Sequence, residues 1–200
     1  MVTAGEEREM ARRLHVVIAG SESATGAALA DLYRNSGARV SALPLDGDAE
    51  PATAGLADGP IDILIFADDF RAPRRRAAEL RRTELEAGLE RLAFKPFHVA
   101  NTLRPALAAV HGKLVLLTRS DAGMTVQDRT GAYLERPFRA AAHALWRCLS
   151  VEWQPEITCL TLALDNPPEI DAGLLATIAA AKNPPEGSPL LDRTGETLPW

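Results

Sequence analysis

Apolar runs of strand length alternate with stretches of helical periodicity along the whole chain. Residues 16–19, 61–66, 113–118 and 157–164 are short and almost purely apolar, which is typical of strands buried on both faces of a parallel sheet. Between them, apolar residues recur at helical spacing, most regularly over residues 137–152. Strands that alternate with helices predict an α/β fold, namely a doubly wound parallel sheet with helices on both faces.

The first of these units, residues 15–40, combines a strand, a turn, a helix and a second strand. The turn runs from Gly20 to Gly26, and the helix that follows ends at Gly37. This order is the opening unit of a Rossmann-like dinucleotide-binding fold, in which turn amides and a helix N-terminus hold a pyrophosphate. The candidate cofactor-binding residues are therefore Gly20, Ser21, Ser23 and Gly26.

Two side chains in this turn count against phosphate binding. Ala24 stands where a glycine would allow the backbone to approach a phosphate closely, and its methyl group narrows that path. Glu22 adds a carboxylate that would repel a pyrophosphate. The alternative interpretation is a tight turn between strand and helix that binds nothing.

Composition narrows the class of protein. The chain has 200 residues, 46% of them hydrophobic, and a net charge of −5, which fits one domain over residues 14–200 after a flexible lead-in, residues 1–13. The acidic balance argues against nucleic-acid binding, and no apolar run approaches the roughly 20 residues of a membrane span. The start of the chain lacks the apolar segment of a secretory signal. Two cysteines and four histidines show no metal-ligand spacing, so we expect no metal site and a cytoplasmic location.

The order of these pieces resembles the short-chain dehydrogenase/reductase family over nearly the whole chain. The resemblance implies a Rossmann-like sheet, NAD(P) binding and hydride transfer between that cofactor and a carbonyl or alcohol. It also implies dimers or tetramers formed through residues 89–110 and 137–152. The segments that carry it are A-G-S-E-S-A-T-G at 19–26, I-D-I-L-I-F at 61–66, G-K-L-V-L-L-T-R-S at 112–120, A-A-A-H-A-L-W-R-C-L-S-V-E-W at 140–153 and D-R-T-G-E-T-L-P-W at 192–200.

Catalysis in that family needs a Tyr that exchanges the proton and a Lys four residues later that lowers the pKa of that Tyr. Two registers are compatible with this sequence. One places Glu135 and Arg139 at the Tyr and Lys positions, and the other places Tyr133 and Pro137 there. Neither register supplies both the Tyr and the Lys.

Other positions of the family pattern also differ. The Ser that polarises the carbonyl maps to Arg119, with Ser120 next to it, and the Asn of the proton relay maps near Leu92. Asp68 and Asp69 stand where the family's backbone lies against the cofactor.

The chain is also shorter than ordinary members of the family. Residues 37–40 resemble the start of the family's second strand, and residues 45–48 resemble the end of its third. The segment between them, which recognises the adenosine ribose, is absent, so the sheet is expected to be shortened between the second and third strands.

These departures favour a short-chain dehydrogenase/reductase-like pseudoenzyme. We expect a non-catalytic interaction or regulatory subunit with no bound cofactor, acting as a homodimer or paired with an active relative through the two helices named above. The alternative is an NAD(P)-dependent oxidoreductase with a rearranged site made of Ser120, Tyr133 and an arginine such as Arg139.

Overall fold

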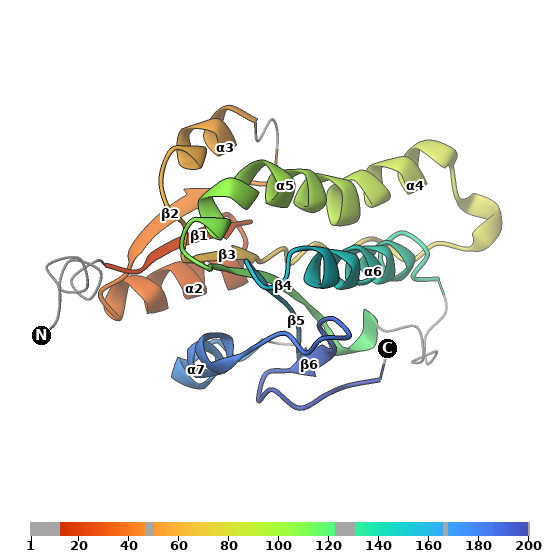
Figure 1. Ribbon diagram of the computed structural model, residues 1–200. Coiled ribbons are helices and arrows are strands. Elements are labelled where there is room, and N and C mark those ends of the chain that lie inside the picture. The colour runs from red at the N-terminus through yellow and green to blue at the C-terminus, as the bar shows by residue number, and fades with distance from the viewer. Residues whose placement is uncertain (1–12, 47–49, 123–130, 166–167, 200) are drawn as a thin grey trace, which may run out of the picture.

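A parallel sheet forms the centre of the molecule in the computed structural model (Figure 1). The structure describes residues 13–46, 50–122, 131–165 and 168–199, so the expected lead-in lies almost entirely outside the described residues. Six strands are arranged in the order β2-β1-β3-β4-β5-β6, and all neighbours are parallel. Their bounds are β1 His15–Ala19, β2 Arg39–Leu43, β3 Ile63–Phe66, β4 Lys113–Arg119, β5 Thr158–Leu164 and β6 Leu190–Asp192.

Helices cover both faces of this sheet, as the sequence predicts. Side chains alternate along β1, so that Val16 and Ile18 pack with α2 and α7, whereas Val17 and Ala19 pack with α5 and α6. Figure 1 shows α2 and α7 on one side of the sheet and α3, α5 and α6 on the other. The bounds are α2 Ala24–Asn35, α3 Glu50–Ala57, α4 Arg82–Leu89, α5 Lys95–Ala108, α6 Arg136–Glu152 and α7 Ala172–Ala180.

The sheet has few strands on the side of β1 that faces away from β3. The doubly wound order has two strands on that side, whereas the described residues contain only β2 there, followed directly by α3. The predicted shortening between the second and third strands is therefore confirmed.

Two elements differ from what the local pattern indicates. Apolar residues recur at helical spacing from Ala77 onward, but a 3₁₀ turn spans Ala77–Glu79 and α4 begins only at Arg82. The reason is a pair of capping boxes, in which the carboxylates of Glu79 and Glu84 accept the amide N–H groups of Arg76 and Arg81. The second element is β6, because three residues near a Pro- and Gly-rich tail carry too little pattern to be recognised as a strand.

Gly26 lets α2 begin directly against the turn that precedes it. A Cβ added there would lie 2.2 Å from the carbonyl oxygen of Gly20, closer than any real contact. Since this neighbour is backbone, it has little freedom to move.

We therefore expect Gly26→Ala to lower the free energy of unfolding by about 1–3 kcal/mol, as overpacking does. The matched control is Gly55→Ala in α3, where a Cβ meets nothing within 4 Å in the described part of the chain. That control should be neutral or stabilising by about 0.5–1 kcal/mol. Urea unfolding measures both, and equal effects would contradict the close approach.

Candidate functional site

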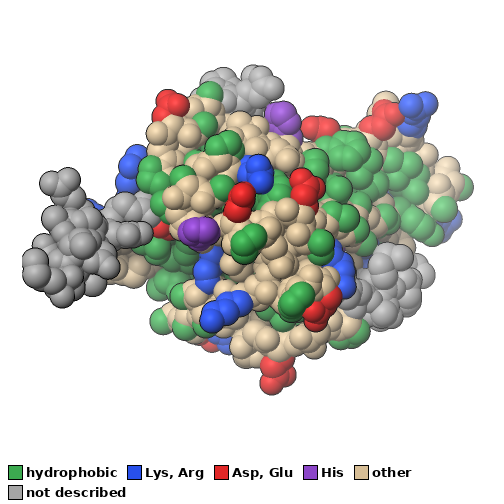
Figure 2. Space-filling view, in the orientation of Figure 1, with side chains coloured by type: hydrophobic (Ala, Val, Ile, Leu, Met, Phe, Trp, Pro, Cys, Tyr) green, Lys and Arg blue, Asp and Glu red, His purple; other side chains and the backbone are tan. Residues whose placement is uncertain are grey.

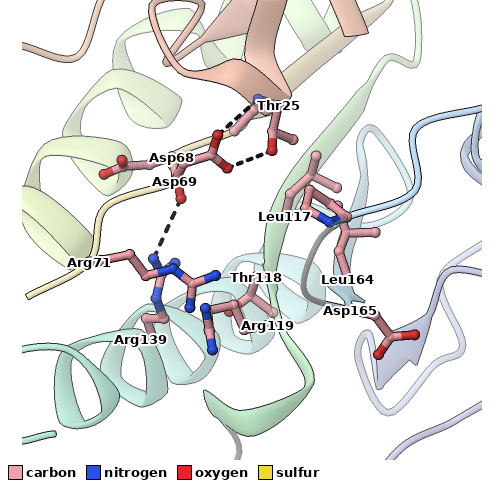
Figure 3. Close-up of a pocket in the computed structure, with 12 residues that line it drawn as sticks. Thr25, Asp68, Asp69, Arg71, Leu117, Thr118, Arg119, Arg139, Leu164 and Asp165 are labelled. Carbon is pink, nitrogen blue, oxygen red and sulfur yellow. Dashed lines mark hydrogen bonds between the residues drawn. The ribbon is translucent and has the colours of Figure 1, made fainter. Parts of the chain in front are cut away.

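A cleft lies at the carboxyl ends of the central strands, which is where ligands bind in open α/β sheets. Its walls come from the first turn of α2, from the loop after β3 and from the ends of β4 and β5. Figure 3 shows the guanidinium groups of Arg71, Arg119 and Arg139 gathered on one side of this cleft. The lining residues are Thr25, Ala67, Asp68, Asp69, Arg71, Leu117, Thr118, Arg119, Arg139, Leu164, Asp165 and Pro168.

The turn between β1 and α2 packs directly on the loop after β3. Gly20 has φ +86°, and a Cβ there would lie 2.6 Å from the carbonyl oxygen of Ala67. The Ser23 hydroxyl donates to that same oxygen at 2.6 Å and accepts the amide of Gly26 at 2.9 Å, as an N-cap residue does. Ser21 lies in the same turn and is half-buried. Gly20, Ser23 and Gly26, predicted as cofactor contacts, are thus already engaged in closing this turn.

A carboxylate of the chain lies at the N-terminus of α2. One Asp69 oxygen accepts the backbone N–H of Thr25 at 2.9 Å, and the other accepts its hydroxyl at 2.5 Å. The positive end of a helix dipole favours an anion at this point, whether a phosphate or a side chain. Asp69 therefore takes the place that a pyrophosphate would need.

Glu22 contacts the loop after β2. Its Oε1 accepts the backbone N–H groups of Leu45 at 2.8 Å and Asp46 at 3.2 Å. The carboxylate is therefore held by this loop, a contact that the sequence did not predict.

Three charged side chains meet between the end of β4 and the start of α6. Arg139 donates from Nε to Glu135 Oε1 at 3.1 Å, and Arg119 Nε lies 3.8 Å from the same oxygen. Arg139 also donates from Nη2 to the carbonyl oxygen of Phe70 at 2.9 Å. We call these three residues the Arg119–Glu135–Arg139 network. A guanidinium stays protonated in proteins, so neither arginine supplies a titrating proton donor.

Ser120 and Tyr133 lie apart from this network. Ser120 opens a 3₁₀ turn, Ser120–Ala122, and Tyr133 lies before α6 with 43% of its surface exposed. Neither lines the cleft, whereas Arg139 does. Leu92, at the position of the relay Asn, is buried inside a π-helical turn, Glu90–Phe94.

The space that remains in the cleft is small. It measures about 30 Å³, which holds roughly two water molecules, while small-molecule sites usually measure about 300–1,000 Å³. Asp69, Arg119 and Arg139 are among the residues that line this remaining space. Among the described residues, no cluster of three His, Cys, Asp or Glu side chains is placed to hold a metal ion.

Thr25, Arg71 and Asp165 were not selected as candidate site residues, although all three line the cleft. Thr25 lies in the A-G-S-E-S-A-T-G segment that carries the family resemblance. Asp165 had one usable signal, since it directly follows β5 and the ends of parallel strands form such clefts.

His143 connects the cleft to the buried face of α6. Its Nε2 lies 2.8 Å from Thr118 Oγ1. Burial, and secondarily the nearby charge of Arg139, lower the pKa of His143 to about 4. In the unfolded chain this histidine has the ordinary pKa of about 6.5. Between pH 6.5 and 4 the unfolded chain therefore binds more protons than the folded chain, so the free energy of unfolding falls as the pH falls.

We expect this histidine to make the wild type lose about 3 kcal/mol of unfolding free energy between pH 7 and pH 4. His143→Gln has no titrating ring and lacks this component, so the stability difference between the two proteins must change by that amount. Parallel urea titrations at several pH values measure it. A difference that is independent of pH would show that His143 is not buried in its neutral form.

Comparisons with known proteins identify the fold of the chain. No family model and no curated protein matches the sequence. Among solved structures, the carbonyl reductase Sniffer of D. melanogaster has TM-score 0.78 and 16% identity, covering 94% of this chain and 100% of its own. A carbonyl reductase from Pseudomonas aeruginosa PAO1 in complex with NADP has TM-score 0.78, 19% identity and the same coverage. An NADPH-bound carbonyl reductase from chicken fatty liver has TM-score 0.77 and 13% identity, covering 94% and 95%. The chain has the fold of the short-chain dehydrogenase/reductase family.

Proposed function

We propose that the protein is a non-redox member of this fold, acting as an interaction or regulatory subunit. The observation that carries the proposal is the filled cleft, which leaves about 30 Å³ between the chain's own charged side chains. Asp69 satisfies the N-terminus of α2. In one of the two registers, Glu135 and Arg139, which form an ion pair, take the positions of the Tyr and the Lys that proton transfer would need. The site then stabilises the scaffold rather than holding a substrate.

The interaction surface of this proposal is formed by α5 and α6. Phe94, just before α5, is 51% exposed, and Val151, near the end of α6, is 53% exposed. Figure 2 shows hydrophobic side chains gathered over α4 and the adjoining end of α5. Exposed apolar groups of this kind are typical of contact surfaces, although Phe94 and Val151 lie at different ends of the two helices. The described part of the chain contains no helix long and apolar enough to cross a membrane.

If two copies meet through this surface, Phe94→Glu should convert a dimer into a monomer at micromolar concentration, because a charge would be buried in an apolar contact. Leu14→Glu is the matched control, since Leu14 is 41% exposed and lies outside α5 and α6. Light scattering after size exclusion measures the mass. A monomeric wild type, or equal dissociation in both variants, would contradict the homodimer.

A second candidate is an NAD(P)-dependent oxidoreductase acting on a carbonyl or alcohol through Ser120, Tyr133 and Arg139. The likeness to carbonyl reductases solved with NADP or NADPH supports this candidate rather than the first. It requires Asp69 to leave Thr25, and it requires the exposed Tyr133 to turn toward the cleft.

One titration separates the two candidates. The non-redox candidate predicts no calorimetric binding of NADH or NADPH to the wild type at about 1 mM, since Asp69 already occupies the anion position at the N-terminus of α2. The second predicts saturable binding and NADPH oxidation with a carbonyl substrate, lost in Tyr133→Phe. Asp69→Ala serves as a matched variant, because it removes the anion and leaves the turn intact. Binding to that variant alone would identify the Asp69 carboxylate as the group that closes the cleft, whereas tight binding to the wild type would overturn the first candidate.

A further inference from the structure

A second open space lies on the other side of the loop after β3. This open pocket of about 500 Å³, called the cavity below, is bounded by residues 70–73, by α4 and the π turn, and by the loop after β2. This volume falls within the range of small-molecule sites, about 300–1,000 Å³, and exceeds the 30 Å³ of the cleft more than tenfold. We propose that this cavity binds an uncharged, mostly apolar small molecule. The cavity is bounded partly by α4, which also carries apolar side chains of the proposed interaction surface, but the proposal does not require that surface to be an interface.

The wall of the cavity is mainly apolar and comes from segments far apart in the sequence. Leu134 and Gly88 are buried, and Phe70 is half-buried. Burying an apolar ligand surface against such a wall releases about 25 cal/mol per Å². The apolar lining residues are Leu45, Phe70, Ala72, Pro73, Ala87, Gly88 and Leu134.

The cations in the wall are already engaged, which decides the charge of the ligand. Arg91 pairs with Asp46 at 2.8 Å and with Asp68 at 3.0 Å. Lys95 donates from Nζ to the carbonyl oxygen of Leu45 at 2.6 Å. The two cations share the wall with three carboxylates, those of Asp46, Glu84 and Glu90, so an anionic ligand would meet no net positive charge.

The acidic groups in the wall do not favour a cation either. Glu84 accepts the backbone N–H of Arg81 at 3.1 Å and lies 3.5 Å from its Nε. These contacts hold the pKa of Glu84 below its usual range, the backbone hydrogen bond from Arg81 being the largest cause. Glu90, the remaining carboxylate besides Asp46, is exposed to water. A neutral ligand therefore suits the cavity best.

The wall is held in place before any ligand binds. The guanidinium carbon of Arg91 lies 4.6 Å from the centre of the Phe70 ring, so the ring is fixed by a cation–π contact. A Cβ added at Gly88 would lie 2.7 Å from the Phe138 ring, which shows how closely α4 packs on α6. A preformed wall lowers the entropy cost of binding.

The test uses N-phenyl-1-naphthylamine, an uncharged apolar probe whose fluorescence rises in apolar surroundings. We expect saturable binding with one site per chain. Ala87→Trp and Ala72→Trp place an indole in the cavity and should weaken binding at least about tenfold. Ala176→Trp is the matched control, because Ala176 is an exposed alanine on α7, on the opposite face of the sheet, and it should bind the probe as the wild type does.

Three results would overturn the proposal: no saturable binding, equal affinity in the Ala87→Trp and Ala176→Trp proteins, or displacement of the probe by NADPH, which would assign it to the cleft. Circular dichroism checks that the variants fold. If both cavity variants unfold, amide NMR shifts of the wild type decide, since the probe must shift the signals of Ala87 and Gly88. NADPH binding that leaves the probe in place would contradict the non-redox function and leave this site intact.

Discussion

The contact between the β1–α2 turn and the loop after β3 is the constraint on which the site depends. Gly20 lets the turn approach the carbonyl group of Ala67, and the Ser23 hydroxyl joins the two segments at 2.6 Å. This approach brings Asp69 within reach of Thr25, so the N-terminus of α2 gains a carboxylate from the same chain. An anion at a helix N-terminus contributes about 0.3–1 kcal/mol. The arrangement that would attract a phosphate is thus satisfied by an internal contact.

The loop after β3 is tied from both sides, and it separates two different spaces. Arg139 of α6, which lines the cleft in Figure 3, donates to the carbonyl oxygens of Asp68 and Phe70, while Arg91 of the π turn pairs with the carboxylate of Asp68. Asp69 then faces α2, and the Phe70 ring faces the apolar cavity. The same loop therefore closes the cleft and forms one wall of the larger cavity, so a displacement of this loop would change both.

The sequence predicted what depends on local pattern. Strands such as Ile63–Phe66 are buried on both faces and are almost purely apolar, so both the sheet and its helical cover were recognisable. The position of Tyr133 was not decided by spacing, because two registers two residues apart fit the chain equally well. Only the helical geometry of α6 brings Arg139 to the cleft, where Glu135 pairs with it. The apolar cavity was not predictable, since its wall combines segments that no local pattern connects.

The fold of a protein and the chemistry of its site have different physical requirements. A core accepts many apolar side chains of suitable volume, which is why TM-scores of 0.77–0.78 accompany identities of only 13–19%. Proton transfer needs one kind of group at one distance. A lysine ammonium can lower the pKa of a neighbouring Tyr, and a guanidinium can take its place only if the geometry of the site changes. The sheet can therefore persist while Arg119, Glu135 and Arg139 form a network of ion pairs. Function has to be argued from those side chains, because the fold alone is compatible with both catalysis and its absence.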